Sequence, residues 1–295
     1  MNNKVMILKG KSDIFPDYLY SNIYYYYIDT ANNKILNFLF RFFKKFNLQL
    51  IKLFFGNWKN DIKKYSTFIL FDSGCSNYII NRIKKYNKNA KIIFWYWNGL
   101  EEYNNILFDS KYIDEFWTYN RFDADKYHLK FNPQFYFKEN KINKKSNITE
   151  DIIFLGRNKD RKNELLSLKD CLEKNKLKCN FHIVENMKDF LSYHDYLKMI
   201  EKSKCILDFN YYLPGGLTLR PLEAMFFEKK LITNNKDIVN YSFYDKDNIF
   251  IIGEDDINNI YEFINKPYKK INDEIKNYYT FNEWLNRILN NIKTK

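Results

Sequence analysis

The stretch that decides the fold reads Pro214-Gly215-Gly216-Leu217-Thr218-Leu219-Arg220-Pro221-Leu222-Glu223-Ala224. It holds two of the eight glycines of the chain and lies between two strand-like apolar runs, 204–209 and 230–233. A strand, a glycine-rich turn and a helix start favour an anion, because backbone N–H groups and the helix dipole both point positive charge at the turn. Arg220 adds a charge-assisted contact, and Glu223 is placed one turn later to accept hydrogen bonds from ribose hydroxyls. The stretch therefore predicts a site for a phosphorylated ligand.

Strand-like and helix-like segments alternate on both sides of this stretch. The expected strands are 5–8, 67–71, 91–97, 116–119, 151–155, 179–184, 205–209 and 231–233. The expected helices are 35–54, 77–86, 124–129, 163–174, 196–202, the segment from the glycine turn to about 227, and 282–292. This alternation predicts parallel sheets covered by helices. The polar segment 138–147 is the best candidate for a linker between two α/β halves, whose ligands would bind at the carboxyl ends of the strands, in a cleft between the halves.

A second glycine turn in the same half carries basic residues. Phe154-Leu155-Gly156-Arg157 is a strand end, and Lys159, Arg161 and Lys162 follow closely. Taken alone, these residues favour a solvated basic helix start. If they face Gly215-Gly216, they become ligands for a diphosphate.

The first half offers polar residues at two strand ends. Asp72 follows a buried strand and is a candidate general base for a hydroxyl acceptor, although a helix N-cap near Ser76 explains it equally well. Asn98 and Glu101 follow the next strand and are candidate acceptor contacts. A turn with a capping box is the alternative for that pair.

Composition narrows the functional classes. The 295-residue chain has a net charge of +12, and residues 1–66 hold 11 basic and 4 acidic side chains. Such an excess suits nucleic acid, an anionic membrane or a phosphorylated substrate. No nucleic-acid-binding motif accompanies it, and the three histidines lack metal-ligand spacing, so we expect neither nucleic acid nor a metal. Four cysteines without a framework, no signal peptide and no long apolar run indicate a cytoplasmic protein without a membrane span.

The segment 35–64 mixes Phe, Leu and Trp with Lys and Arg. Such a mixture is typical of a helix lying in the interface of an anionic membrane. The alternative is an ordinary helix that packs on the sheet with a basic outer face. The length of its apolar surface favours the membrane-bound helix over the ordinary one.

The second half of the chain resembles the donor-binding domain of GT-B glycosyltransferases. The resemblance is closest to the bacterial lipopolysaccharide and capsule biosynthesis proteins of that fold. It rests on 203–208, 216–224, 229–235 and 243–249, with 95–98 and 123–133 in the first half. It covers about residues 110–252 well and the rest of the chain weakly.

This resemblance implies two Rossmann-like domains facing across a cleft. Residues 1–140 would bind the acceptor and 148–275 the donor, and 276–295 would form a helix that packs back on the first domain. The implied reaction moves a sugar from a nucleotide-activated donor to a hydroxyl of a lipid-linked or polysaccharide acceptor, without a metal, in lipopolysaccharide, O-antigen or capsule synthesis. The implied location is peripheral, on the inner face of the cytoplasmic membrane.

The family's donor contacts transfer to matching positions of this chain. The phosphates would lie on Gly215, Gly216, Leu217 and Thr218, the ribose on Glu223, and the leaving diphosphate beside Arg157 and Lys162. The chain departs from the family's pair of glutamates eight positions apart, because Gly215 precedes Glu223 at that spacing. The stereochemistry is therefore open, and Asp72 is the candidate base if the enzyme inverts.

Two other functions stay open. One is a polyol-phosphate transferase that uses a nucleotide-activated donor. The other is a non-catalytic nucleotide-sugar-binding partner of a polysaccharide assembly complex.

Overall fold

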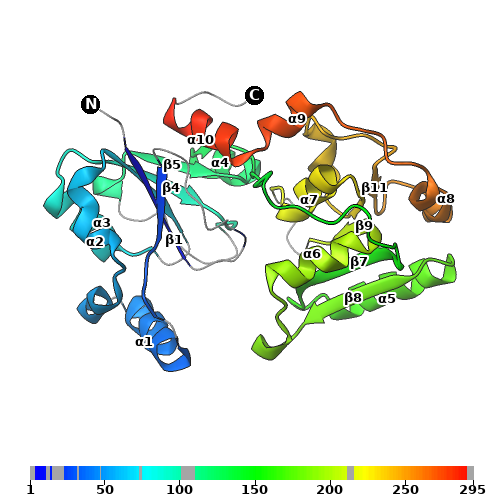
Figure 1. Cartoon of the computed structure of the whole chain (residues 1–295), viewed down its shortest axis with the longest axis horizontal. Coiled ribbons are helices and arrows are strands. Elements are labelled where there is room, and N and C mark those ends of the chain that lie inside the picture. The colour runs from blue at the N-terminus through cyan, green and yellow to red at the C-terminus, as the bar shows by residue number, and fades with distance from the viewer. Residues whose placement is uncertain are drawn as a thin grey trace. The chain divides into compact units, whose positions relative to one another are not determined.

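The computed structural model describes residues 4–10, 14, 23–31, 33–46, 48–72, 75–100, 110–210 and 216–290. The chain divides into two compact units, residues 1–132 and 133–295, and each contains a parallel β-sheet (Figure 1). The expectation of two α/β halves is thereby confirmed. The finer GT-B arrangement depends on how the halves face each other and stays a prediction.

The sheet of the first unit has the strand order β2-β1-β3-β4-β5-β6, with every pair parallel. Its strands are β1 (Val5–Lys9), β2 (Ile23–Tyr27), β3 (Thr67–Phe71), β4 (Lys91–Tyr96), β5 (Glu115–Thr118) and β6 (Lys130–Phe131). The runs TFILF of β3 and KIIFWY of β4 are buried beyond their first residues. Such continuous apolar runs form the strands of a parallel sheet because both of its faces are covered.

The helices of the first unit pack largely against one face of this sheet through a shared apolar core. They are α1 (Lys34–Lys45), α2 (Trp58–Asp61), α3 (Asn77–Tyr86) and α4 (Arg121–Tyr127), with the 3₁₀ helices η1 (Gln49–Phe54), η2 (Ile62–Lys64) and η4 (Ser110–Tyr112). The single helix expected over 35–54 is two elements. Leu48 is extended, with φ −86° and ψ 140°, so the chain turns between α1 and η1.

The sheet of the second unit has the order β11-β10-β9-β7-β8, again with parallel pairs. Its strands are β7 (Glu150–Arg157), β8 (Cys179–Val184), β9 (Ser203–Asp208), β10 (Lys230–Thr233) and β11 (Ile249–Ile251). Its helices are α5 (Lys162–Lys174), α6 (Tyr193–Glu201), α7 (Leu219–Phe227), α8 (Ile260–Asn265), α9 (Asp273–Tyr278) and α10 (Phe281–Leu289), with the 3₁₀ helices η5 (Met187–Asp189), η6 (Lys236–Asn240) and η7 (Ile257–Asn259). Helices α5 and α8 share one apolar core with the sheet, and α6 and α7 both contact β9.

The polar segment 138–147, expected as a linker, lies inside the second unit. The backbone N–H of Asn143 donates to Glu201 at 2.8 Å, and Lys144 pairs with Glu228 at 2.9 Å. These contacts hold the segment against α6 and the end of α7. The boundary therefore falls at 132/133 rather than near 140.

Helix α10 is anchored on the first residues of the second unit. The Trp284 and Phe135 ring centroids are 4.4 Å apart, and those of Phe281 and Phe137 are 4.9 Å apart. Backbone hydrogen bonds join Tyr136 to both flanks of the turn before α10. Packing of this helix back on the first domain stays a prediction, and residues 291–295 lie outside the described chain.

Candidate functional site

The topology of the second sheet selects one place for a ligand. From β7 the chain passes through α5 to β8 on one side, and then through α6 to β9 on the other side of β7. The loops after β7 and β9 therefore leave in opposite directions. In open α/β sheets, ligands bind in the crevice outside the strand ends at such a switch point. Both predicted phosphate turns, after β7 and after β9, lie here.

The loop after β7 is a strained turn with cations. Lys159 and Asp160 have φ values of 46° and 59°, a left-handed conformation that is uncommon for residues other than glycine. The turn delivers Arg161 to the N-cap position of α5, where its N–H donates to the Asn158 carbonyl at 3.0 Å. Strain of this kind concentrates at functional sites.

Arg161 ties the ends of the two strands together. Its guanidinium donates to the Arg157 carbonyl from Nε at 3.3 Å and from Nη2 at 3.1 Å, and to the Phe209 carbonyl from Nη1. The residue is only 5% exposed. The positive charge of Arg161 is thus held between the loops after β7 and β9.

The end of β9 and the start of α7 bring a second arginine to the same place. Arg220 donates to the Asp208 carboxylate at 3.2 Å and to the Leu155 carbonyl at 2.5 Å. Thr218 is the N-cap of α7: its hydroxyl oxygen accepts from the Arg220 N–H at 3.3 Å, and the hydroxyl donates to Asp208 at 2.9 Å. Asp208 is fully buried, so it fixes the first turn of α7 relative to β9.

Gly156 makes room for both guanidinium groups. A Cβ atom at this position would lie 2.8 Å from Arg220 Nη2, 3.0 Å from Arg161 Nη2 and 2.9 Å from the Phe154 ring. The Cζ atoms of both arginines lie 5.3 Å from the centroid of the Phe154 ring. A side chain at 156 would therefore displace the two cations that meet there.

The electrostatics show a local excess of positive charge. Burial and the nearby charge of Arg220 lower the pKa of Arg161 to about 10, although Asp208 and Glu164 act in the opposite direction. The pKa of Lys159 is lowered by the partial burial of its amino group, and also by the nearby positive charges of Arg161 and Arg220. Burial opposes the charge of Arg220, but Asp208 raises its pKa above the ordinary value. Lys159, Arg161 and Arg220 thus gather close to one another at the ends of these strands, and an anionic ligand would be attracted to such a cluster of cations.

Glu223 belongs to a buried network behind this cluster. Its carboxylate accepts hydrogen bonds from the hydroxyls of Tyr193 at 2.9 Å and Tyr196 at 3.0 Å, and the Tyr193 and Tyr136 hydroxyls are 2.7 Å apart. Burial raises the pKa of Glu223 to about 7, although the tyrosines and Arg220 oppose this effect. Glu223 is 1% exposed here, so the ribose contact implied by the resemblance requires this network to open and stays a prediction.

The other predicted donor residues differ in position. Arg157 is exposed, with its guanidinium 5.0 Å from the Phe190 ring centroid, and Lys162 pairs with Glu185 at the end of β8. Gly216 and Leu217 are buried beside Thr218, whereas Gly215 lies outside the described residues. Lys159 and Arg161 follow the same turn in the sequence as candidate diphosphate ligands, and both lie beside Arg220 in the structure.

The first unit has its own switch point between β1 and β3, and Asp72 lies at that end of β3. Asp72 Oδ2 accepts hydrogen bonds from the backbone N–H and the side-chain amide of Asn98, each at 3.2 Å. Ser76 is the N-cap residue of α3. Two predicted acceptor-side residues therefore meet, while Glu101 lies outside the described residues.

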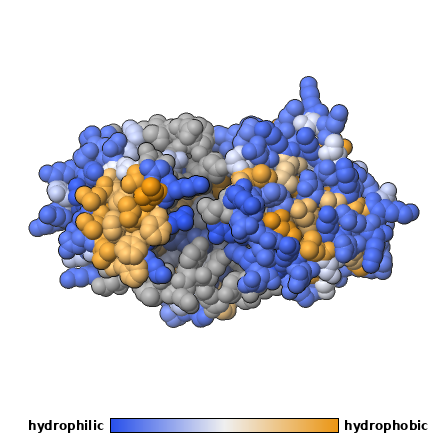
Figure 2. Space-filling model, turned by 90° about the horizontal axis from the view of Figure 1, so that it is seen from below, coloured by the Kyte–Doolittle hydropathy of each residue, from blue (hydrophilic) through white to orange (hydrophobic). Residues whose placement is uncertain are grey.

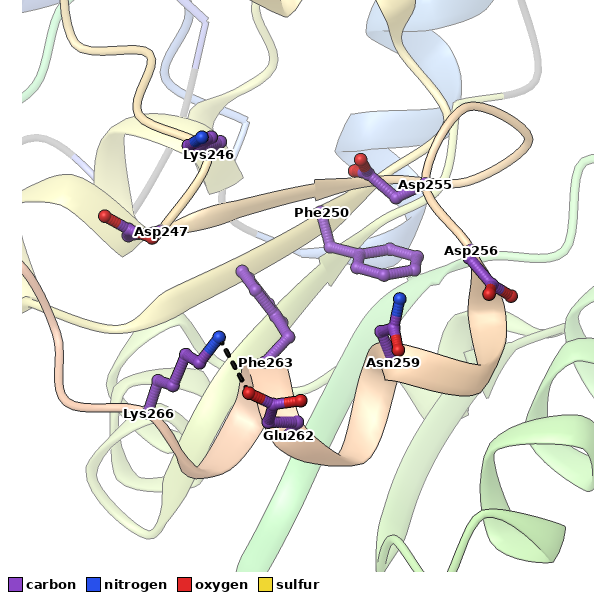
Figure 3. Close-up of a pocket in the computed structure, with 9 residues that line it drawn as sticks. All are labelled: Lys246, Asp247, Phe250, Asp255, Asp256, Asn259, Glu262, Phe263 and Lys266. Carbon is purple, nitrogen blue, oxygen red and sulfur yellow. Dashed lines mark ion pairs between the residues drawn. The ribbon is translucent and has the colours of Figure 1, made fainter.

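A pocket of about 410 Å³ opens elsewhere, beside the edge strand β11 (Figure 3). Phe250 and Phe263 form its apolar part, with ring centroids 5.5 Å apart, and Glu262 pairs with Lys266 at its rim. Asp255 accepts from the Ile251 N–H at 2.6 Å, and Asp256 caps η7. These acids thus serve local backbone structure.

Among the described residues, no group of three or more His, Cys, Asp or Glu side chains is placed to hold a metal ion. None of their helices is both long and apolar enough to cross a membrane.

Comparison with known proteins gives no assignment. No family model matches this chain, and no curated protein sequence matches it significantly.

Proposed function

We propose that this chain is a glycosyltransferase that binds a nucleotide-activated sugar by its diphosphate at the carboxyl ends of β7 and β9. The observation that carries the proposal is the cluster of Arg161, Arg220 and Lys159 at the switch point of the second sheet. The N-terminus of α7 adds its dipole to the same place. A diphosphate is the part of such a donor that this combination of charges suits best.

The cluster also suits the chemistry of sugar transfer. When the bond between the sugar carbon and the donor phosphate breaks, negative charge develops on the departing diphosphate. Cations that are already in position stabilise that charge without further reorganisation. Arg161 and Arg220 are held by main-chain carbonyls and Asp208, so they are preorganised for this role.

The acceptor is a hydroxyl group, whose proton must leave as its oxygen bonds to the sugar. Asp72 is our candidate base for an inverting transfer, with Asn98 orienting its carboxylate. From the resemblance, we propose a lipid-linked or polysaccharide acceptor in bacterial surface glycan synthesis, with the enzyme working at the inner face of the cytoplasmic membrane.

The test measures nucleotide binding and turnover on the same protein. UDP, GDP, CMP, dTDP and their sugars are screened by thermal shift, since a ligand that binds only the folded state stabilises it by about 2.7 kcal/mol at 100 times its Kd. We expect one nucleoside diphosphate to raise the Tm by several degrees, and its sugar to release that diphosphate in the presence of acceptor. Asp72→Asn should keep the thermal shift and lose turnover.

Product analysis separates the alternatives. Transfer of the sugar without phosphate supports the proposal, whereas phosphate retained in the new linkage indicates a polyol-phosphate transferase. Binding without turnover on any acceptor lipid indicates the non-catalytic partner. Absence of any shift across the panel would contradict the donor site itself.

A further inference from the structure

Helix α1 has two apolar faces. Phe40 is buried in the core of the first unit, and Leu36, Leu39 and Phe43 pack against that core. One apolar face is enough to attach a helix to a domain. The second apolar face therefore has another explanation.

The outer face is a row of exposed aromatic rings. Phe38, Phe42 and Phe46 follow one another at intervals of four residues, with successive ring centroids 6.4 and 4.7 Å apart. Ile35 is 73% and Phe38 67% exposed. On η1, Leu50 and Leu53 extend the face, and Leu53 is 74% exposed. Figure 2 shows the resulting hydrophobic area over α1 on the face seen from below.

The segment that forms this docking face, α1 and η1, carries basic residues and no acidic ones. Between residues 30 and 60 the chain has six basic residues and no Asp or Glu, the basic ones being Lys34, Arg41, Lys44, Lys45, Lys52 and Lys59. Two copies of such a face would repel each other, because like charges would meet across the interface. An anionic surface with an apolar interior is complementary to it.

A cationic pocket of about 240 Å³ adjoins the docking face, between η1 and α3. Lys52, Arg82 and Lys85 line it, together with the rings of Phe55, Tyr78 and Tyr86. Lys52 belongs to η1, as do the exposed Leu50 and Leu53, and its Nζ atom lies 5.0 Å from the centroid of the Tyr78 ring in the pocket. Arg82 Nε is buried, and among the described residues no group accepts a hydrogen bond from it.

We infer that the docking face binds an anionic bilayer, with its aromatic and leucine side chains in the acyl region and a lipid phosphate in the Lys52–Arg82–Lys85 pocket. Side chains of this kind bury into the headgroup and acyl boundary, while lysines meet the phosphates. The surface is narrower than the sequence pattern indicates. Trp58 is fully buried and donates from Nε1 to the Ile28 carbonyl at 3.0 Å, so it anchors the core rather than the membrane.

The first experiment measures flotation of the full chain with vesicles. The vesicles are phosphatidylcholine alone, or phosphatidylcholine with 30% phosphatidylglycerol, a composition chosen for the assay. We expect binding only to the anionic vesicles, weaker in high salt. Phe38→Ser with Phe42→Ser should lower the affinity at least about tenfold, given the apolar area removed from the lipid. The matched control changes exposed apolar residues of the second unit, Val239→Ser with Tyr261→Ser, and should bind normally.

A second comparison isolates the pocket. Lys52→Ala with Arg82→Ala is set against Lys34→Ala with Lys45→Ala, which removes the same charge from the same face outside the pocket. Diffuse attraction to an anionic surface contributes roughly a factor of five in affinity per cation. The Lys34→Ala with Lys45→Ala variant should therefore bind anionic vesicles about 25-fold more weakly than the wild type. The Lys52→Ala with Arg82→Ala variant should lose clearly more affinity than that. An equal loss in the two variants would exclude a lipid phosphate site in the pocket. No flotation of the wild type with anionic vesicles, or a dimer abolished by the phenylalanine variant, would overturn the inference. Melting temperatures confirm folding, and the outcome does not depend on the proposed transferase activity.

Discussion

Gly156 is the position in the proposed donor site where an added Cβ atom would meet two guanidinium groups. We predict that Gly156→Ala displaces the two guanidinium groups that would otherwise contact the new methyl group. Overpacking of this kind destabilises by about 1–3 kcal/mol, and displaced cations should also weaken diphosphate binding about tenfold or more. Thermal shift with and without nucleotide measures both effects.

The control for this substitution is Gly99→Ala in the first unit. A Cβ atom there meets Asp123 only at 3.9 Å and Asn120 at 4.0 Å, which is ordinary contact. We expect little change in stability and none in nucleotide binding. Equal behaviour of the two variants would contradict the assignment of Gly156 to the arginine cluster.

The raised pKa of Glu223 predicts that the free energy of unfolding depends on pH. Burial raises its pKa from 4.5 to about 7 in the folded protein, so the folded state binds this proton more tightly than the unfolded state. The resulting stability is complete below pH 4.5 and is lost as the pH rises through 7. The shift corresponds to about 3 kcal/mol. Denaturant unfolding from pH 4.5 to 8 should show the advantage of the wild type over Glu223→Gln falling by up to that amount.

Glu228→Gln is the matched control, because hydrogen bonding to Lys144 lowers the pKa of Glu228 despite its partial burial. A carboxyl with a lowered pKa stabilises the fold above its ordinary pKa, so the advantage of the wild type over Glu228→Gln should not fall as the pH rises. A flat difference for Glu223→Gln would show that this carboxyl does not titrate as described.

At the residue scale, part of the site was predictable from the sequence. Arg220 and Thr218 follow a glycine turn after a strand, and both lie at the N-terminus of α7 as expected. The Glu223 network was not predictable, because Tyr193 and Tyr196 are 27 to 30 positions away along the chain. Among 25 tyrosines, their residue type alone carries no signal.

At the scale of elements, the cap of α7 links stability to binding. Thr218 accepts from Arg220 N–H and donates to Asp208, so Thr218→Ala loses a helix cap and one partner of a buried carboxylate. We predict a loss of about 1–2 kcal/mol in unfolding free energy and weaker nucleotide binding. Denaturant unfolding and calorimetry measure the two quantities.

Thr280→Ala offers the same change at another helix. Thr280 caps α10 by accepting from Glu283 N–H at 3.4 Å, far along the chain from the donor site. A comparable loss of stability with unchanged nucleotide binding is expected. Unchanged binding in both variants would argue against a role of the α7 N-terminus.

Helices and strands were predicted correctly where the spacing of their apolar residues follows a clear period. Helix α3 begins and ends at the expected residues, because its isoleucines follow helical spacing. Strand β2 was missed, since the run IYYYY has no alternation of polar and apolar residues. Strand β11 was also missed, because three residues are too few for a periodic signal.

At the scale of the whole molecule, the sequence predicted two α/β halves but not their boundary. Composition placed a linker at 138–147, where the chain is polar. Contacts with Glu201 and Glu228 attach that segment to the second unit instead, and such long-range contacts are not visible in local composition. The switch points likewise follow from strand order, which only the structure shows.

The central claim is that a diphosphate binds at the ends of β7 and β9, and Lys159 allows its most direct test. Lys159 and Lys176 both have positive φ, 46° and 62°, so glycine relieves the same backbone strain and removes the same charge at each. Lys159 lies beside the arginine cluster, whereas Lys176 precedes β8, at the opposite ends of the strands.

The measurement is calorimetric titration of both variants with the nucleoside diphosphate that gives the largest thermal shift. Loss of one charge-assisted contact should weaken binding by Lys159→Gly about tenfold, while Lys176→Gly binds like the wild type. Both variants should be at least as stable as the wild type. Wild-type affinity in Lys159→Gly, or an equal loss in both variants, would contradict the account.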